Sequence, residues 1–454
     1  MSSPTYAPGI EVDKPRSARA ITRGKLVSRS ENAVIRVPVA WLLFGAAFLP
    51  RLVLVLREPQ SGETFFDEPG MVAYSLSHGE GFSNPYGGPT GPSAHVAPFV
   101  PLLLALFIKI FGSTDAAWLA SRVVACTVVA FYAALLPTIS ERVGLGRIAG
   151  ILAGLVAAVP FFLWVETNGR FETPYLLLAT TLLVTTTAFW LAPSQPERSV
   201  GKWAWLGLAW GLGVLLTPTL LPVMLALLAL GTLPALSAGK ALRLRQAGAV
   251  LGGAMLVFMP YSIERSVRLG APVLVRSNLG LELFLSNNDA AHPRFLDNMA
   301  DTAVMKRHHP LLRRREAIRV RSMGEGAYHA MMRERATDWI ASHPQRFASL
   351  TGGRIAEFWF PTANRFVKTA YLYALTVFGV GWLLVIAFTR SDPRRSLARF
   401  WLVALVAFSL IHYVIQADVR YRYPLQGLVL LAACACFLDV MQRVGRSWLA
   451  SDVH

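Results

Sequence analysis

The sequence has few charged residues for its length. Of its 454 residues, 16% are Asp, Glu, Lys or Arg, whereas soluble proteins average roughly 25%. The chain is 54% hydrophobic with a mean hydropathy of +0.44, and apolar runs recur along most of it. This composition excludes an ordinary soluble domain and predicts an all-α polytopic membrane protein.

Acidic residues and cysteines are also scarce. Lys and Arg total 44 against 27 Asp and Glu, which gives a net charge of +17. Because no soluble basic domain can be separated, cytoplasmic arginines and lysines explain this charge better than nucleic-acid binding. The three cysteines, Cys126, Cys434 and Cys436, lie in apolar runs, so we expect packing residues and no disulfide or metal site. The excess of arginine over lysine suggests a bacterial genome and hence a bacterial plasma membrane.

Residues 1–37 lack the apolar core of a cleaved signal peptide and are predicted to be a disordered cytoplasmic tail. The topology then depends on 96–112, an apolar stretch that contains two prolines and a lysine. It is shorter than the roughly 20 residues of a usual span, so we expect a helix lying in the membrane interface. A crossing there would export several short basic loops, so the positive-inside rule favours about ten spans with both termini cytoplasmic. The predicted spans are 38–56, 116–139, 147–165, 172–191, 203–216, 218–236, 247–262, 370–389, 399–416 and 424–441.

The largest segment outside these spans should form an external cap. Within it, 311–341 has helical periodicity and is predicted to end at His343-Pro344, before a second helix over 345–358. Few aliphatic residues are available for an independent core, so we expect a lid on the membrane part. The predicted domains are the tail 1–37, the N-terminal transmembrane module 38–262 with its first external loop 57–115, the cap 263–369, the C-terminal helices 370–441 and the cytoplasmic tail 442–454.

The most informative polar stretch is TFFDEPGMVAYSLSHG, residues 64–79. Asp67 is a favourable N-cap, Pro69 suits a first helical turn and Gly79 suits a helix end, which predicts a helix over 68–78. Asp67 and Glu68 then stand at its positive end, and an ionised carboxylate beside a bilayer can act as a general base toward a hydroxyl group. A capped surface helix without any chemistry remains the alternative.

Other polar residues are predicted on the same side of the membrane. Charges at a membrane are costly and suggest a site, and carboxylates opposite arginines suit a substrate with a phosphate and a hydroxyl group. A local charge cluster, interfacial arginine anchors and an ordinary tyrosine belt are the alternatives. These residues are Glu166, Arg170, Glu172, Asp418, Arg420, Tyr421 and Arg422.

Two further groups of polar residues have competing interpretations. Asn287, Asn288 and Asp289 suit a sugar contact, but a loop with turn-forming residues explains them equally well. His308-His309 with His292 matches no standard zinc spacing and has no evident carboxylate partner, so we expect no metal.

Four motifs, in their order along the chain, resemble the GT-C integral-membrane glycosyltransferases (glycosyltransferase family 39-like), in the branch of protein O-mannosyltransferases and the lipid A aminoarabinose transferase. The resemblance implies a GT-C bundle with interfacial helices in the first external loop and a mainly helical cap. It also implies a metal-independent, inverting transferase that uses a polyprenyl-phosphate-linked sugar and no cofactor. The motifs are FFDEPGMVAYSL, FGSTDAAWLASRVV, ETNGRFETPYLLL and VRYRYPLQ.

By this resemblance, Asp67 would deprotonate the acceptor hydroxyl and Glu68 would shape the acceptor pocket or share that role. Glu172 would be the second acid, with Glu166 as the other candidate. The sequence departs from the aminoarabinose branch at Thr217-Pro218, where that branch has a lysine, and its second acid is Glu rather than Asp. The residues that would hold the lipid phosphate are Arg420 or Arg422.

Two other classes of function remain open. A transporter or lipid flippase would often show internal repeats and broken helices near the midplane, and the two halves of this chain show no clear repeat. An assembly scaffold with a degenerate site would be favoured if Asp67, Glu172 and Arg420 lay far apart. The donor sugar and the acceptor, whether protein, lipid or glycan, are not specified by the sequence.

Overall fold

The computed structural model describes residues 38–58, 67–192, 198–237, 241–300, 304–362 and 366–451. The predicted tail 1–37 lies outside these residues. The described part is helical, and its β-structure consists of two isolated bridges, Ser83 with Pro92 and Arg294 with Ala417. Seven helices are long and apolar enough to cross a membrane, which confirms a multi-pass helical membrane protein. They are Pro38–Arg57, Asp115–Arg142, Thr173–Leu191, Leu242–Leu269, Phe366–Phe388, Arg395–Val414 and Val419–Arg446.

Shorter apolar helices account for the other predicted spans, so the total of about ten crossings stays a prediction. They are α5 (Arg147–Ala158), α8 (Val200–Leu216) and α9 (Leu220–Ser237). A further short apolar helix, α3 (Phe99–Phe111), covers the stretch expected to lie in the membrane interface. The remaining membrane elements are α4 (Asp115–Arg142), α7 (Thr173–Leu191), α10 (Ala241–Leu269), α17 (Phe366–Ala374), the π-helical η1 (Leu375–Val380), α18 (Gly381–Phe388), α19 (Arg395–Val414), α20 (Val419–Arg422), the 3-10 turn η2 (Tyr423–Leu425) and α21 (Gln426–Ser451).

The prediction of one continuous span over 147–165 is wrong. Helix α5 ends at Ala158, Val159 is extended, and a separate short helix, α6 (Leu163–Thr167), follows. Pro160 explains the break, because a residue that precedes proline is disfavoured in the helical region. The break turns the chain back into the bundle and places Glu166 in its interior.

Glycine lets two of the membrane helices approach closely. A Cβ atom on Gly207 of α8 would lie 2.3 Å from the carbonyl oxygen of Val250 on α10, and one on Gly253 of α10 would lie 2.5 Å from that of Ala204. Small residues at such positions allow the close backbone contact on which packing between membrane helices relies.

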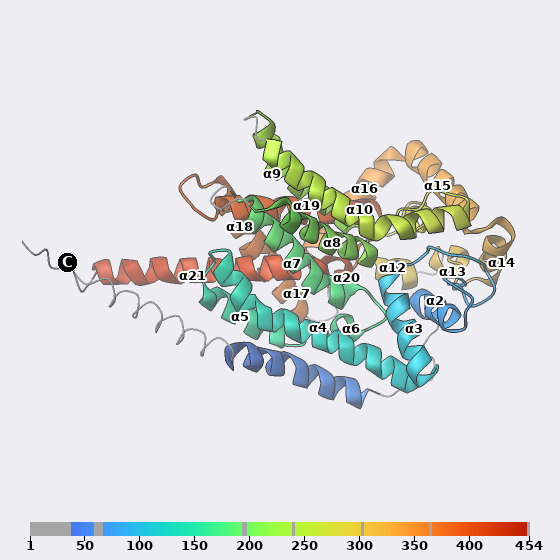
Figure 1. The fold of residues 1–454 in the computed structure, drawn as a ribbon, viewed down its shortest axis with the longest axis horizontal. Coiled ribbons are helices and arrows are strands. Elements are labelled where there is room, and N and C mark those ends of the chain that lie inside the picture. The colour runs from blue at the N-terminus through green and yellow to red at the C-terminus, as the bar shows by residue number, and fades with distance from the viewer. Residues whose placement is uncertain are drawn as a thin grey trace, which may run out of the picture.

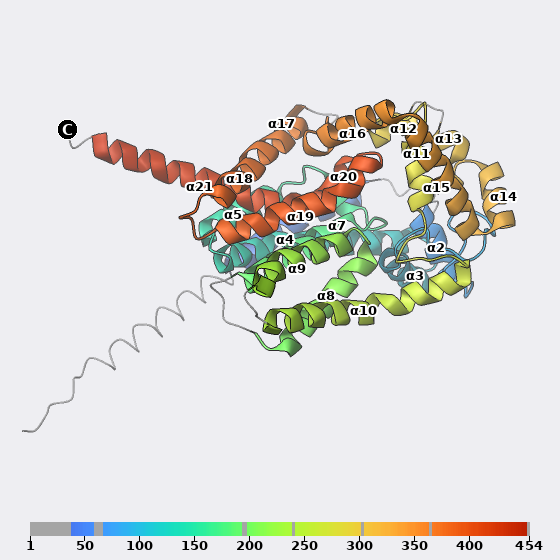
Figure 2. The same ribbon diagram turned by 90° about the horizontal axis from the view of Figure 1, so that it is seen from above.

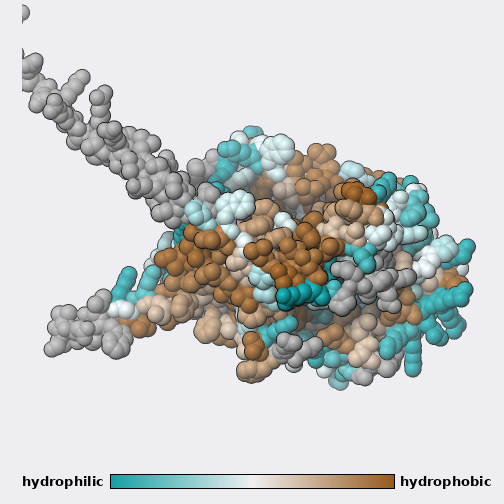
Figure 3. All heavy atoms as spheres, turned by 90° about the horizontal axis from the view of Figure 1, so that it is seen from below, coloured by the Kyte–Doolittle hydropathy of each residue, from teal (hydrophilic) through white to brown (hydrophobic). Residues whose placement is uncertain are grey.

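Helix α3 lies across the end of the bundle. Figure 1 shows it at a steep angle to α4 and α5, next to α2 (Glu68–Ser77), and Figure 2 places both at the end that carries the cap. Its 13 residues are fewer than a usual span requires, and its position in the membrane interface stays a prediction. In Figure 3, hydrophobic residues cover the middle of one face of the bundle, and hydrophilic residues gather on the cap end.

The cap consists of short helices around a small apolar core. Tyr86 of the first loop packs into this core with Leu281, Tyr328 and Met332 of the cap. The prediction of one helix over 311–341 is wrong, because Gly324 adopts a φ of +83° and separates α14 from α15. The break at His343-Pro344 is confirmed. The helices are α11 (Leu279–Ser286), α12 (Phe295–Ala300), α13 (Met305–His308), α14 (Arg314–Met323), α15 (Glu325–Ser342) and α16 (Pro344–Trp359).

Candidate functional site

The start of α2 agrees with its prediction from sequence. Asp67 caps the helix by accepting a hydrogen bond from the Gly70 amide at 2.9 Å, and Pro69 occupies the first turn. Its other carboxylate oxygen lies 3.1 Å from Nε of Arg170, whose guanidinium stands over the Trp118 ring at 4.4 Å. Burial raises the pKa of Asp67 to about 6, and Arg170 counteracts this shift.

Gly169 brings Arg170 to this position. A Cβ atom at Gly169 would lie only 2.4 Å from the carbonyl oxygen of Ser121 on α4, so the loop 168–172 rests directly on that helix. The contact fixes the place from which Arg170 reaches Asp67.

Glu68 points toward the cap and lies 3.5 Å from Nε2 of His309. Burial raises the pKa of this carboxyl group, and the positive charges of Arg420 and Arg276 partly offset the effect. Burial lowers the pKa of both His309 and His95.

Glu172 and Arg420 complete the cluster. Glu172 lies 3.5 Å from Nη1 of Arg276, whose Nε donates to the carbonyl oxygen of His95 at 3.1 Å. Arg420 stands over the rings of Phe171 and Phe295 at 5.1 and 4.6 Å and donates to the Tyr421 hydroxyl at 3.0 Å. The structure thus brings together six of the predicted residues: Asp67, Glu68, Arg170, Glu172, Arg420 and Tyr421.

Glu166 has no place in this cluster. It is buried and accepts hydrogen bonds from Arg51 at 3.0 Å, from the Tyr423 hydroxyl at 2.7 Å and from the Phe162 amide at 3.3 Å. Arg51 is itself fully buried and also donates to the carbonyl oxygens of Ala47, Ala157, Ala158 and Val159. Through these contacts, the Glu166 carboxylate links the first membrane helix to α6 and η2 inside the bundle.

Arg422 and the two asparagines are also engaged internally. Arg422 is buried and donates to the carbonyl oxygens of Trp359 and Leu372 and to the Thr376 hydroxyl. The Asn287 amide donates to the Leu283 and Val414 carbonyl oxygens and accepts from Arg354. Asn288 donates to the Phe284 and Leu285 carbonyl oxygens at the end of α11. The contacts of Arg422 and Asn287 join the cap to the bundle, whereas those of Asn288 stay at the end of α11.

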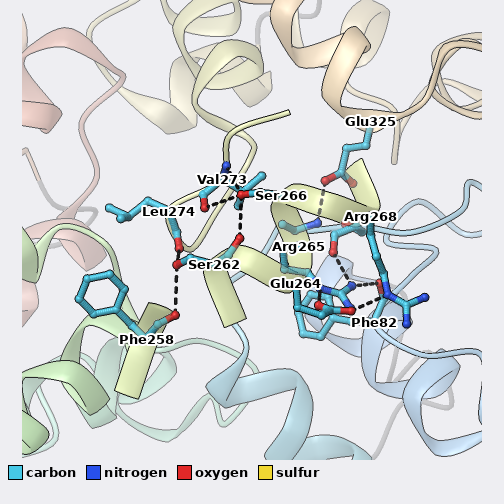
Figure 4. Close-up of polar contacts among 12 residues, drawn as sticks. Phe82, Phe258, Ser262, Glu264, Arg265, Ser266, Arg268, Val273, Leu274 and Glu325 are labelled. Carbon is cyan, nitrogen blue, oxygen red and sulfur yellow. Dashed lines mark hydrogen bonds and ion pairs between the residues drawn. The ribbon is translucent and has the colours of Figure 1, made fainter. Parts of the chain in front are cut away.

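Sequence reasoning missed Arg276, His95 and the contacts that hold their loops. Figure 4 shows Arg265 on α10 reaching the first loop, where it donates to the carbonyl oxygens of Phe82 at 2.9 Å and Ser93 at 3.2 Å. Glu325 at the start of α15 accepts from the Ala94 amide at 2.7 Å and from the Ser277 hydroxyl at 2.6 Å. The first loop is therefore held by α10 and by the cap immediately before His95.

The clustered acids differ in their capacity to bind a metal ion. Asp67 and Glu172 each face an arginine, which competes with a cation for the carboxylate. Among the described residues, the group whose ligand atoms lie close enough to share one ion is Glu68, His95 and His309.

An apolar groove of about 380 Å³ runs between α5, η1 and α21. Leu152, Leu155, Leu375 and Phe437 are among its lining residues, and none of the clustered acids or arginines contributes to it. The polar cluster is therefore separate from this groove.

These features define a helical membrane protein with a cluster of carboxylates and arginines at one end of its bundle. The fold is similar to that of an Archaeoglobus fulgidus oligosaccharyltransferase, solved by crystallography with Zn and sulfate, at a TM-score of 0.50 and 13% identity over 90% of this chain. It is also similar to oligosaccharyltransferase AglB from Archaeoglobus fulgidus, in complex with an inhibitory peptide and a dolichol-phosphate, at a TM-score of 0.52 and 13% identity over 94% of this chain.

The chain spans 49% and 52% of the lengths of these two oligosaccharyltransferases. At 13% identity this likeness concerns the fold alone, and it agrees with the helical membrane architecture that the sequence motifs imply. No protein-family model matches the chain, and no curated protein matches it. The narrower resemblance to O-mannosyltransferases and the aminoarabinose transferase stays a prediction.

Proposed function

We propose that this protein is a GT-C glycosyltransferase that moves a sugar from a polyprenyl-phosphate-linked donor to a hydroxyl acceptor at the extracytoplasmic face of a bacterial plasma membrane. The observation that carries the proposal is the meeting of Asp67, Glu172 and Arg420 at one end of the bundle, from three distant parts of the chain. A protein of similar fold binds dolichol-phosphate, which is a lipid of the class proposed here for the donor.

Each clustered residue has a role in this reaction. Asp67, oriented by Arg170, removes the proton from the acceptor hydroxyl, and the resulting oxygen attacks the anomeric carbon of the donor sugar. The bond from that carbon to the phosphate breaks on the opposite face, so the configuration inverts. The polyprenyl phosphate leaves with the bonding electrons, and Arg420 stabilises its negative charge.

Arg276 joins Arg420 as a second cation for the phosphate, and Glu172 holds Arg276 in place. Arg422 and Glu166 are left out of the catalytic set, because their polar atoms are used by internal partners. Glu68 is adjacent to the base Asp67 and lines the part of the site that binds the acceptor.

The test replaces Asp67 by Asn and by Ala in full-length protein and measures transfer from labelled polyprenyl-phosphate sugars in membranes. Loss of a general base typically costs about 10²–10⁴-fold in rate, and we expect a fall of that size in both variants. Asp338→Asn is the matched control, because this aspartate is exposed on α15. Undiminished transfer in both Asp67 variants would remove Asp67 as the base.

A further inference from the structure

A second cluster beside the proposed site has the composition of a metal centre. Glu68, His95 and His309 each present a ligand atom, and these three atoms lie within 4.8 Å of one another. They come from the start of α2, from the loop before α3 and from the residue after α13. Only the folded chain brings them together, since 214 residues separate His95 from His309 (309 − 95).

The imidazole rings are held in position. Nδ1 of His95 is hydrogen-bonded to the Tyr86 hydroxyl at 2.7 Å, which leaves Nε2 for another partner. Arg276 holds the backbone of the same residue through its carbonyl oxygen. A hydrogen bond to the second ring nitrogen is the usual way in which proteins orient a metal-binding histidine.

His329 supplies an independent observation. Its side chain is only 4% exposed, and neither ring nitrogen has a hydrogen-bond partner. The ring stacks on His95 with a centroid distance of 5.8 Å, and the ring of His309 lies 6.1 Å from that of His95. Because buried polar groups almost always have partners, two orphaned nitrogens beside His95 and His309 point to a polar occupant that these residues share.

We propose that Glu68, His95 and His309 bind one Zn²⁺ ion and that His329 completes a four-ligand shell. A set of imidazoles with one carboxylate suits zinc, whereas Mg²⁺ and Ca²⁺ prefer oxygen ligands alone. The ion joins the first external loop to the cap. It uses Glu68, which lies next to the proposed base Asp67, but it takes no part in the proton removal or in the departure of the phosphate. Many structural zinc sites use cysteine sulfur ligands, whereas this site would use histidine nitrogens and one carboxylate oxygen.

Binding requires a small local contraction. With Zn–N distances of about 2.0–2.1 Å, ligand atoms of a tetrahedral site lie roughly 3.4 Å apart, so Glu68, His95 and His309 close in by about an ångström. His329 lies outside this group of three, and its ring must also turn away from its stacking on His95 to reach the ion. The 3.3 Å contact from the Leu311 amide to Nδ1 of His309 is lost when Nε2 binds the ion. Arg276 and Arg420 also lie near Glu68, so the imidazoles supply most of the affinity.

The experiment uses full-length protein in detergent, stripped with EDTA and then dialysed against Zn²⁺. Bound metal is counted by inductively coupled plasma mass spectrometry, and the zinc Kd is measured by competition with a fluorescent chelator. We expect one zinc per chain, a zinc-dependent rise in Tm, and no comparable uptake of Mg²⁺.

The variants Glu68→Gln, His95→Gln, His309→Gln and His329→Gln should each weaken zinc binding by more than about 100-fold, because loss of an outer partner alone costs roughly 10–100-fold. Tyr86→Phe should fall within that smaller range. His308→Gln is the matched control, since His308 is adjacent to His309 but meets the Phe284 ring edge to face, and it should bind zinc like the unmodified protein.

Three outcomes would overturn the proposal. The first is unmodified protein that takes up no zinc after stripping, a result that does not depend on how any variant folds. The second is equal zinc affinity in His308→Gln and His309→Gln. The third is unchanged affinity in His329→Gln, which would refute the four-ligand shell.

Discussion

Replacing Glu166 by Gln tests whether this carboxylate serves the fold or the substrate. In the folded protein it faces Arg51, which is 0% exposed and lies in the first membrane helix. Gln would keep an oxygen for the Tyr423 hydroxyl but would leave the Arg51 charge without a counter-charge. Breaking a buried pair by removing one partner costs about 3–5 kcal/mol.

The expected loss of stability is large enough to measure. An unfolding entropy of about 2.1 cal/mol/K per residue gives roughly 0.95 kcal/mol/K for a chain of this length, so about 4 kcal/mol lowers Tm by on the order of 4 °C. The assay is thermal unfolding in detergent, followed by intrinsic tryptophan fluorescence. Glu334→Gln is the control, since Glu334 is exposed on α15 and should leave Tm unchanged.

The double variant Arg51→Met with Glu166→Gln adds a second arm to this test. Because it leaves no unpaired charge in the bundle, it should be more stable than Glu166→Gln alone. A Glu166→Gln protein that keeps its Tm but loses transfer activity would refute the reasoning, because that pattern belongs to a residue that binds substrate.

Two further predictions concern the geometry of the site. Gly169→Ala should lower Tm and displace Arg170, because the added Cβ would meet the Ser121 carbonyl oxygen at 2.4 Å. Gly201→Ala is the control and should be neutral, because a Cβ atom there meets nothing within 4 Å. Thermal unfolding and transfer assays compare the two variants. Arg420→Lys should reduce transfer with little change in Tm, because Lys lacks the planar group of donors with which Arg binds phosphate. Arg422→Lys should instead lower Tm through loss of its contacts to Trp359 and Thr376. The opposite pattern would contradict the assignment of Arg420 to the phosphate and of Arg422 to the fold.

Local signals in the sequence were sufficient for the elements around Asp67. The capping aspartate, the following proline and the terminal glycine act over one or two helical turns, and the helix forms where they indicate. The long apolar runs likewise located the helices that can cross a membrane. The breaks at Pro160 and Gly324 carried local signals too, and the long apolar or periodic runs around them obscured both.

Contacts between residues that are distant along the chain could not be predicted from local sequence patterns. Nothing near Glu166 indicates that Arg51, 115 residues earlier, will neutralise it inside the bundle. Arg420 and Arg422 are two positions apart on one short helix, yet one faces the acids and the other packs against the bundle. Sequence reasoning grouped His309 with His308 and His292, whereas the fold places it beside His95 and Glu68.

The hydrogen bond from the Ala94 amide to the Glu325 carboxylate joins two residues that are 231 positions apart in the sequence. During synthesis the first loop therefore lacks this partner until most of the membrane helices and the beginning of α15 have left the ribosome. Until then, the polar backbone groups of the loop form hydrogen bonds with water or with a chaperone, and Asp67 and Glu68 are not covered by the cap. Nascent chains released before residue 325 should thus carry an open, protease-sensitive loop, and longer chains a protected one.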